Sequence, residues 1–326
     1  MIISQTPVRM SFFGGGTDFP EFFNEYSGSV ISTTFNKYCH VNVRPMPLNL
    51  FDYTTKLSYA QIEEVNSVDD IKHPAIRNAM KWLGLERICL NYDADIPAKT
   101  GLGTSSAFSV GMLNAFYTMQ GITKTKRELA DDAIYLERTL CSEEGGIQDQ
   151  IAAAFGGFNR IDFSADGYTV TPINITPERK QALNDNLMIF FTGLSRYSFH
   201  VQKSTKSMLC KKTQELMEIL RMVDDAEKIL VNPQSSLDDF GLMLNETWML
   251  KRSISSKISN SMIDDIYQKA LNAGALGGKL LGAGGGGCLL FYVPKEKQNH
   301  VRLALSDLYE VDFEFENEGT KIICNY

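Results

Sequence analysis

One short segment of the chain combines glycines and hydroxyl-bearing residues in a way that could bind phosphate. It is "PAKTGLGTSSAFSVG", residues 97–111, and it leads into an apolar run. Gly101 and Gly103 allow successive backbone N–H groups to turn inward as an anion nest, and a following helix would direct its positive end at the same point. Hydroxyl groups come from Thr104, Ser105 and Ser106. The segment is a candidate triphosphate cradle, but a Ser or Thr that caps a helix after a glycine turn explains it equally well.

Other nucleotide-binding and catalytic patterns fit this segment poorly. The G-x-x-x-x-G-K-[ST] pattern of P-loop proteins is absent, and no third glycine follows Gly103 at the spacing of a dinucleotide-binding loop. The four histidines form neither a metal-binding pattern nor a triad. Because short glycine motifs have many false matches, the segment needs support from elsewhere in the chain.

Two acidic residues lie where a carboxylate would be partly removed from water. Asp149 lies between two glutamines, just before the alanine-rich segment "IAAAF". An acid in that place acts on a ligand, pairs with a cation, or stabilises the positive end of a helix. Glu137 lies beside Leu136 and four positions after Ala133, at the edge of a predicted apolar helix face. Taken alone, Glu137 is most simply a border residue in an ion pair.

Two further glycine-rich segments flank the first. They are "FFGGGTDFPEFF", residues 12–23, and "LLGAGGGGCLLF", residues 280–291. Glycine is costly inside a regular element because it loses the most backbone entropy on folding. The four glycines at 284–287 therefore indicate a close backbone approach or a positive φ angle.

Strand and helix patterns surround these segments and would position them. Residues 29–46 are rich in β-branched and aromatic residues, and residues 87–97 form a second strand pattern that runs into the candidate cradle. A helix is predicted over residues 105–121. The next helix starts at Thr125, which begins the S/T-x-x-E pattern of a capping box.

The second half of the chain interleaves strand and helix patterns. Strand patterns occupy residues 186–194, 286–294 and 311–316, and helix patterns occupy residues 201–230, 240–255 and 262–276. A change of composition near Pro177 predicts a boundary between two domains, residues 1–175 and 176–326. The predicted fold class is α+β.

Together and in this order, the three glycine-rich segments resemble the motifs of the GHMP kinase superfamily, named for galactokinase, homoserine kinase, mevalonate kinase and phosphomevalonate kinase. The family motif P-x-x-x-G-L-G-S-S-A appears as "PAKTGLGTSSA", with Thr104 in place of the first serine. The first and third motifs appear as "TPVRMSFFGGGTD" and "LLGAGGGGC". The resemblance covers nearly the whole chain, and three ordered motifs are far more specific than one. It implies a two-domain fold, with a ribosomal-S5-like N-terminal domain that binds ATP and a ferredoxin-like C-terminal domain.

Within the superfamily, the motifs resemble those of sugar 1-kinases, and most of all the D-glycero-D-manno-heptose 7-phosphate kinases. A galactokinase would have G-E-H-T-D where this chain has "GGGTD". The resemblance implies transfer from ATP to the anomeric hydroxyl of heptose 7-phosphate, a step toward nucleotide-activated heptose for surface polysaccharide. An L-fucokinase or another sugar 1-kinase is the nearest alternative, and a non-catalytic sugar sensor on the kinase fold is the second.

The resemblance assigns roles to individual residues. Asp149 corresponds to the catalytic aspartate, and Arg9 to the basic residue that pairs with it. Ser105 and Glu137 correspond to ligands of Mg²⁺. The residues implied to bind ATP are Lys99, Gly101, Leu102, Gly103, Thr104, Ser105 and Ser106. Those implied to bind the acceptor are Gly15, Gly16, Thr17, Asp18, Gly284 and Gly285.

An acceptor that already carries a 7-phosphate needs a cationic pocket. Arg196 and Lys203 follow a predicted strand end and are candidates for binding that phosphate. The alternative is that both are solvated surface charges, the common state of Arg and Lys.

Composition places limits on the class of protein. The 326 residues carry a formal net charge of −7, which argues against a nucleic-acid-binding surface. No apolar run approaches the roughly 18 residues that span a bilayer, and the first residues lack the pattern of a secretory signal. The six scattered cysteines are typical of free thiols in a reducing compartment. We therefore expect a cytoplasmic enzyme that acts on a small-molecule sugar phosphate and has no nucleic-acid or membrane partner. The sequence is also compatible with a homo-oligomer.

Overall fold

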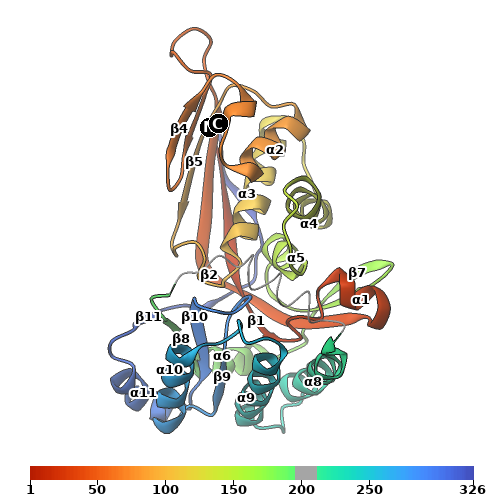
Figure 1. Cartoon of the computed structure of the whole chain (residues 1–326), viewed down its shortest axis with the longest axis vertical. Helices are drawn as coiled ribbons and strands as arrows, with labels where there is room; N and C mark the ends of the chain where they lie inside the picture. Colours follow the sequence, from red (N-terminus) through yellow and green to blue (C-terminus); the bar gives the residue numbers. More distant parts are fainter. Residues whose placement is uncertain (195–210) are drawn as a thin grey trace.

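The computed structural model describes residues 1–194 and 211–326, and these form two β-sheets with helices packed against them (Figure 1). The first sheet has the strand order β13-β1-β2-β5-β3-β4, and β6 and β12 also pair with β2. Its strands are β1 (Ile2–Phe13), β2 (Gly28–Pro45), β3 (Thr55–Ser58), β4 (Ile62–Val65), β5 (Ile88–Ala94), β6 (Phe158–Ser164), β7 (Gly167–Pro172), β12 (Phe315–Glu316) and β13 (Lys321–Asn325).

The helices of the first half are α1 (Pro20–Tyr26), α2 (Pro74–Leu83), α3 (Thr104–Met119), α4 (Lys126–Ile134) and α5 (Gln148–Phe155). Most side chains of α3 are buried, because this apolar helix lies between the sheet and its neighbouring helices (Figure 1). Its backbone approaches β1 closely at Gly111, whose carbonyl accepts a hydrogen bond of 2.7 Å from the Ser4 hydroxyl. A Cβ on Gly111 would lie 2.6 Å from Thr6 Oγ1.

The helix predicted to start at Thr125 does start there. Thr125 and Glu128 form both hydrogen bonds of a capping box. The helix then changes to a π-helical turn at Tyr135–Leu140, a break that the sequence pattern did not predict. Such turns are often found at functional sites, and this one carries Glu137.

The second sheet has the order β11-β8-β10-β9 and is antiparallel throughout. Its strands are β8 (Leu187–Phe191), β9 (Gly277–Leu280), β10 (Cys288–Tyr292) and β11 (Tyr309–Val311). Helices α6 (Pro177–Asp185), α8 (Thr213–Val231), α9 (Leu237–Ile254), α10 (Ser261–Asn272) and α11 (Gln298–Ala304) accompany it. The core between sheet and helices contains large aromatic side chains, among them Phe190, Trp248, Tyr267 and Phe291.

The end of the described chain returns to the first sheet. β13 pairs with β1 and β12 pairs with β2, so both lie in a sheet otherwise built from residues 2–172. The Tyr326 N–H donates to the Met1 carbonyl at 3.0 Å. The domain boundary at 175/176 lies between β7 and α6 and stays a prediction, and the return of β12 and β13 shows that the first sheet needs residues from both sides of it.

Two observations concern the expected setting of the protein. Each of the five cysteines in residues 1–194 and 211–326 is a free thiol. Among the helices that the structure describes, none has both the length and the apolar character needed to cross a bilayer.

Candidate active site

Arg9 and Asp149 form a partly buried ion pair at the junction of three segments. Arg9 Nε and Nη2 donate to the two carboxylate oxygens of Asp149 at 2.8 and 2.6 Å, and Arg9 Nη1 donates to the Gly101 carbonyl at 2.6 Å. Arg9 is 4% exposed on β1, and Asp149 is in the first turn of α5. Because the guanidinium plane fits the carboxylate with two bonds, the Asp149 side chain is held in one orientation.

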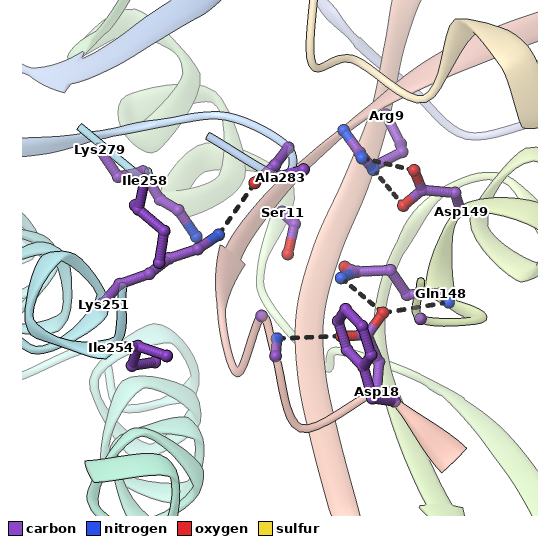
Figure 2. Close-up of a pocket in the computed structure, with 15 residues that line it drawn as sticks. Arg9, Ser11, Asp18, Gln148, Asp149, Lys251, Ile254, Ile258, Lys279 and Ala283 are labelled. Carbon is purple, nitrogen blue, oxygen red and sulfur yellow. Dashed lines mark hydrogen bonds and ion pairs between the residues drawn. The ribbon is translucent and has the colours of Figure 1, made fainter. Parts of the chain in front are cut away.

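Asp18 is the second carboxylate of the same pocket (Figure 2). It accepts hydrogen bonds from the Gly16 N–H at 3.0 Å and from Gln148 Nε2 at 2.9 Å. Burial raises the pKa of Asp18, and the nearby negative charge of Asp149 raises it further. A Cβ on Gly146 would lie 1.8 Å from Asp18 Oδ2, so a side chain at position 146 would displace the Asp18 carboxylate.

Two lysines lie on the other side of the pocket, and the sequence analysis did not identify either (Figure 2). Lys279, on β9, is 2% exposed and donates to the Phe12 carbonyl at 2.7 Å. Lys251, half-buried on α9, donates to the Gly282 carbonyl at 2.9 Å. Burial lowers the pKa of Lys251 to about 8. Burial also lowers the pKa of Lys279 well below its usual value, and the positive charges of Lys251 and Arg9 lower it further. A lysine inside the small and apolar run "GGKLL" was the available signal for Lys279; Lys251, in the last turn of a helix, where basic residues are ordinary, gave none.

The glycine-rich segments at residues 97–111 and 280–291 contact each other through their backbones. A Cβ on Gly101 would lie 2.3 Å from the Leu281 carbonyl oxygen, and one on Gly287 would lie 2.3 Å from that of Thr100. The φ angle of Gly287 is 111°. Both explanations of the glycine run, close approach and positive φ, therefore apply to this segment.

The Gly101–Ser106 segment has the geometry of an anion cradle. Gly103 is the N-cap of α3 with a φ of 75°, and no side chain caps the first turn. The first N–H groups of α3 thus remain available at the positive end of the helix. Leu102 is buried, and its carbonyl accepts from the Arg9 N–H at 3.0 Å.

Glu137 is buried beneath the first turn of α3. Its Oε2 accepts from the Ser106 hydroxyl at 3.0 Å and from the Gln150 side-chain amide, whereas its Oε1 has no partner among the described residues. Burial raises the pKa of Glu137 to about 7, and the charge of Glu143 adds to the effect. Ser105, predicted to share a metal with Glu137, is exposed on the same turn.

Comparison with known proteins identifies the family. The model of the GHMP kinases N terminal domain matches residues 71–157, and the model of the GHMP kinases C terminal matches residues 225–311. The D-glycero-alpha-D-manno-heptose 7-phosphate kinase of Campylobacter jejuni is 31% identical over an alignment of 336 positions that covers 98% of each chain. The chain belongs to the GHMP kinase family. The predicted family, the two-domain α+β GHMP kinase fold and the prediction of an ATP-dependent phosphotransferase are confirmed.

Other GHMP kinases are more distant. The bifunctional fucokinase/GDP-fucose pyrophosphorylase of Arabidopsis thaliana is 23% identical over 96% of this chain and 32% of its own. The structure of a D-glycero-D-manno-heptose 1-phosphate kinase from Bacteroides thetaiotaomicron superposes with a TM-score of 0.81 at 22% identity, over 100% of both chains. A putative sugar kinase from Campylobacter jejuni gives a TM-score of 0.70 at 26% identity, over 98% of this chain and 97% of that one.

The predicted site residues of this GHMP kinase occupy different kinds of position. Gly15, Gly16, Asp18, Arg9 and Asp149 line one pocket, which the structure brings together from distant parts of the chain. The other predicted residues do not line this pocket: some make backbone or side-chain contacts, some are exposed, and two lie outside the described residues.

Thr17 is buried, and its hydroxyl donates to the carbonyls of Gly14 and Ser29 at 2.8 and 3.0 Å, so its side chain holds the loop. The Gly285 N–H donates to the Ile258 carbonyl at 2.8 Å, and a Cβ on Gly284 would lie 2.8 Å from the same oxygen. Lys99 is exposed. Arg196 and Lys203 lie outside the described residues.

Proposed function

We propose that this GHMP kinase transfers the γ-phosphoryl group of ATP to the anomeric hydroxyl of D-glycero-D-manno-heptose 7-phosphate. The products would be the 1,7-bisphosphate and ADP, and the bisphosphate would serve the synthesis of nucleotide-activated heptose for surface polysaccharide. The full-length relative at 31% identity, whose name gives this acceptor, supports the choice of substrate. The free thiols suit a cytoplasmic setting.

The observation that carries the proposal is the fixed Arg9–Asp149 pair. Asp149 would accept the proton of the anomeric hydroxyl. The hydroxyl oxygen would then bond to the γ-phosphorus as the bond between that phosphorus and the ADP oxygen breaks. Arg9 bonds to Asp149 and to the Gly101 carbonyl at the same time, so it links the base to the phosphate cradle. Phosphoryl transfer depends mainly on such positioning and on charge stabilisation.

The nucleotide phosphates would bind at Gly101–Ser106. The uncapped first turn of α3 supplies backbone N–H groups, and Thr104 and Ser105 add hydroxyls there. Lys99, exposed just before the loop, would add positive charge. The backbone contact of this loop with Leu281 keeps its shape.

Mg²⁺ fits the donors near the cradle. Glu137 offers a buried carboxylate oxygen with no partner in the described chain, and Ser105 offers an accessible hydroxyl on the same turn of α3. No cluster of three acidic, His or Cys side chains able to hold a metal occurs in the described residues. In kinases, Mg²⁺ is usually bound by one or two carboxylates together with nucleotide phosphates. When bound, the ion would neutralise charge on the β- and γ-phosphates.

The acceptor would lie between Asp149 and the loop Gly15–Asp18. Asp18 is a hydrogen-bond partner for sugar hydroxyls. Two further polar atoms of the pocket, Ser11 Oγ and Gln148 Oε1, are buried without partners in the described residues. Because an unpaired buried polar atom costs about 1–3 kcal/mol, sugar hydroxyls are their natural partners.

The test is a panel of acceptors with ADP release as the readout. We expect turnover with heptose 7-phosphate, little with L-fucose, D-galactose or D-mannose, and a bisphosphate product by mass spectrometry. Asp149→Asn should lower kcat by about 10³-fold or more and leave ATP binding intact, as loss of a general base does. Asp162→Asn is the matched control, since Asp162 pairs with Arg160 on β6, outside this pocket. Turnover of L-fucose without turnover of heptose 7-phosphate would refute the substrate, and binding of ATP and sugar without transfer would favour a sensor.

A further inference from the structure

We propose that Lys251 and Lys279 bind the phosphate group that the acceptor sugar carries before the transfer. This inference rests on the proposed function and deepens it, because it assigns a site to the substrate's own phosphate. It also differs from the prediction that Arg196 and Lys203 have this role.

The two ammonium groups come from different elements and meet at one pocket (Figure 2). Lys279 points from β9 to the Phe12 carbonyl, and Lys251 points from α9 to the Gly282 carbonyl. Each ammonium has three N–H groups, and the described hydrogen bonds use one of each. The remaining donors can converge on a ligand with several acceptor oxygens.

The charges that line the pocket leave an excess of positive charge. Arg9 and Asp149 pair with each other, so the two lysines are left with Asp18 as the remaining carboxylate of the pocket. No ion pair within the described residues joins either lysine to Asp18 or to another acid. Burial lowers the pKa of both lysines, because an ammonium without a counter-ion is costly to remove from water, and a bound anion would stabilise their charged forms. A phosphate dianion would supply the missing charge.

The lysines and Arg9 enter the pocket from different walls (Figure 2). Arg9 is engaged by Asp149 and the Gly101 carbonyl, whereas the lysines lie across the pocket from Asp18 (Figure 2). Ile254 and Ile258 line the pocket beside them and offer apolar contact to the carbon chain of a sugar. A neutral acceptor such as fucose would leave both ammonium groups without an anion.

The experiment compares acceptors with and without the terminal phosphate. In Lys251→Met and Lys279→Met, we expect kcat/KM for heptose 7-phosphate to fall by about 10- to 100-fold, the effect of losing a charged hydrogen bond. The kcat/KM for unphosphorylated heptose and the KM for ATP should stay within twofold. Lys180→Met is the matched control, because Lys180 is half-buried on α6 with a pKa that burial lowers, and it bonds to Asn317, away from the pocket.

Equal losses on both acceptors, or a raised KM for ATP, would overturn the proposal and assign the lysines to the transferring phosphoryl group. Unchanged kinetics would also overturn it. If Lys279→Met fails to fold, Lys251→Met, at a half-buried position, decides alone.

A binding measurement separates this inference from the proposed function. Titration calorimetry with inorganic phosphate, on enzyme saturated with a non-hydrolysable ATP analogue, should show binding by the wild type and at least tenfold weaker binding by Lys251→Met. If the wild type does not turn over heptose 7-phosphate, the proposed function fails while this titration still tests the lysines. Absent phosphate binding, or equal binding by the variant, refutes the lysine site.

Discussion

Replacing Arg9 by lysine is the most direct test of the site geometry. The wild-type guanidinium makes three hydrogen bonds, two to the carboxylate of Asp149 and one to the Gly101 carbonyl. Lysine keeps the positive charge but lacks the planar fork, so its single nitrogen cannot reproduce this arrangement. Arg9→Lys therefore tests whether orientation, rather than charge, is what the pair supplies.

The expected size of the effect follows from the lost bonds. Lysine retains one contact with Asp149 and loses two charge-assisted hydrogen bonds, each worth about 1.5 kcal/mol at the lower end of their range. The sum of about 3 kcal/mol corresponds to a fall in kcat of roughly 100- to 200-fold. The assay is steady-state ADP release with saturating ATP and acceptor, together with a thermal unfolding curve to show that the variant is folded.

Arg160→Lys is the matched control. Arg160 also bonds to carboxylates, those of Asp162, Asp224 and Glu227, but it lies outside the Arg9–Asp149 pocket. We expect kcat to change less than twofold. If Arg9→Lys retains more than a third of the wild-type kcat, the oriented pair is not needed for the reaction, and the reasoning is wrong.

Three further predictions concern the metal, the acceptor loop and pH. Glu137→Gln should raise the Mg²⁺ concentration for half-maximal activity at least tenfold. Burial raises the pKa of Glu137 to about 7, so the folded wild type should lose stability as the pH rises from about 5 to 7. Denaturant titrations of the variant should lack this slope. Gly146→Ala should raise the KM for the acceptor about tenfold and leave the KM for ATP unchanged, because the new Cβ displaces Asp18. An acceptor KM equal to that of the wild type would contradict this. Since the pKa of Lys251 is lowered to about 8, the KM for a phosphorylated acceptor should rise above pH 8 in the wild type, and this rise should be smaller in Lys251→Met.

The sequence predicts those parts of the structure whose causes are local. The capping box at Thr125, the helix after Gly103 and the strand at Leu187–Phe191 each depend on nearby residues, and each was predicted. Asp149 and Arg9 are 140 positions apart, and their pairing was predicted from the order of family motifs. That order carries three-dimensional information that periodicity lacks.

Features that arise from tertiary contact were not predictable in this way. The π-helical turn at Tyr135–Leu140, strand β13 and the two pocket lysines have weak or no local signals. The sequence also did not show which serine would bond to Glu137. Ser105 and Ser106 are adjacent, and the direction of each hydroxyl depends on how α3 packs. The structure directs Ser106 to Glu137 and leaves Ser105 exposed.

Strand β13 has a consequence for the order of events during synthesis. β1, which carries Arg9, has β13 as one of its two neighbours in the sheet, and just before β13 the Thr320 N–H donates at 2.9 Å to the Ala153 carbonyl in α5, the helix that carries Asp149. Gly319 makes the contact tight, because its Cβ would lie 2.2 Å from the Ala154 carbonyl oxygen. The strand of the arginine and the helix of the aspartate are therefore joined by residues that leave the ribosome long after both. A nascent chain that ends before residue 320 would lack this brace between the strand of Arg9 and the helix of Asp149, so the complete arrangement forms only late in translation.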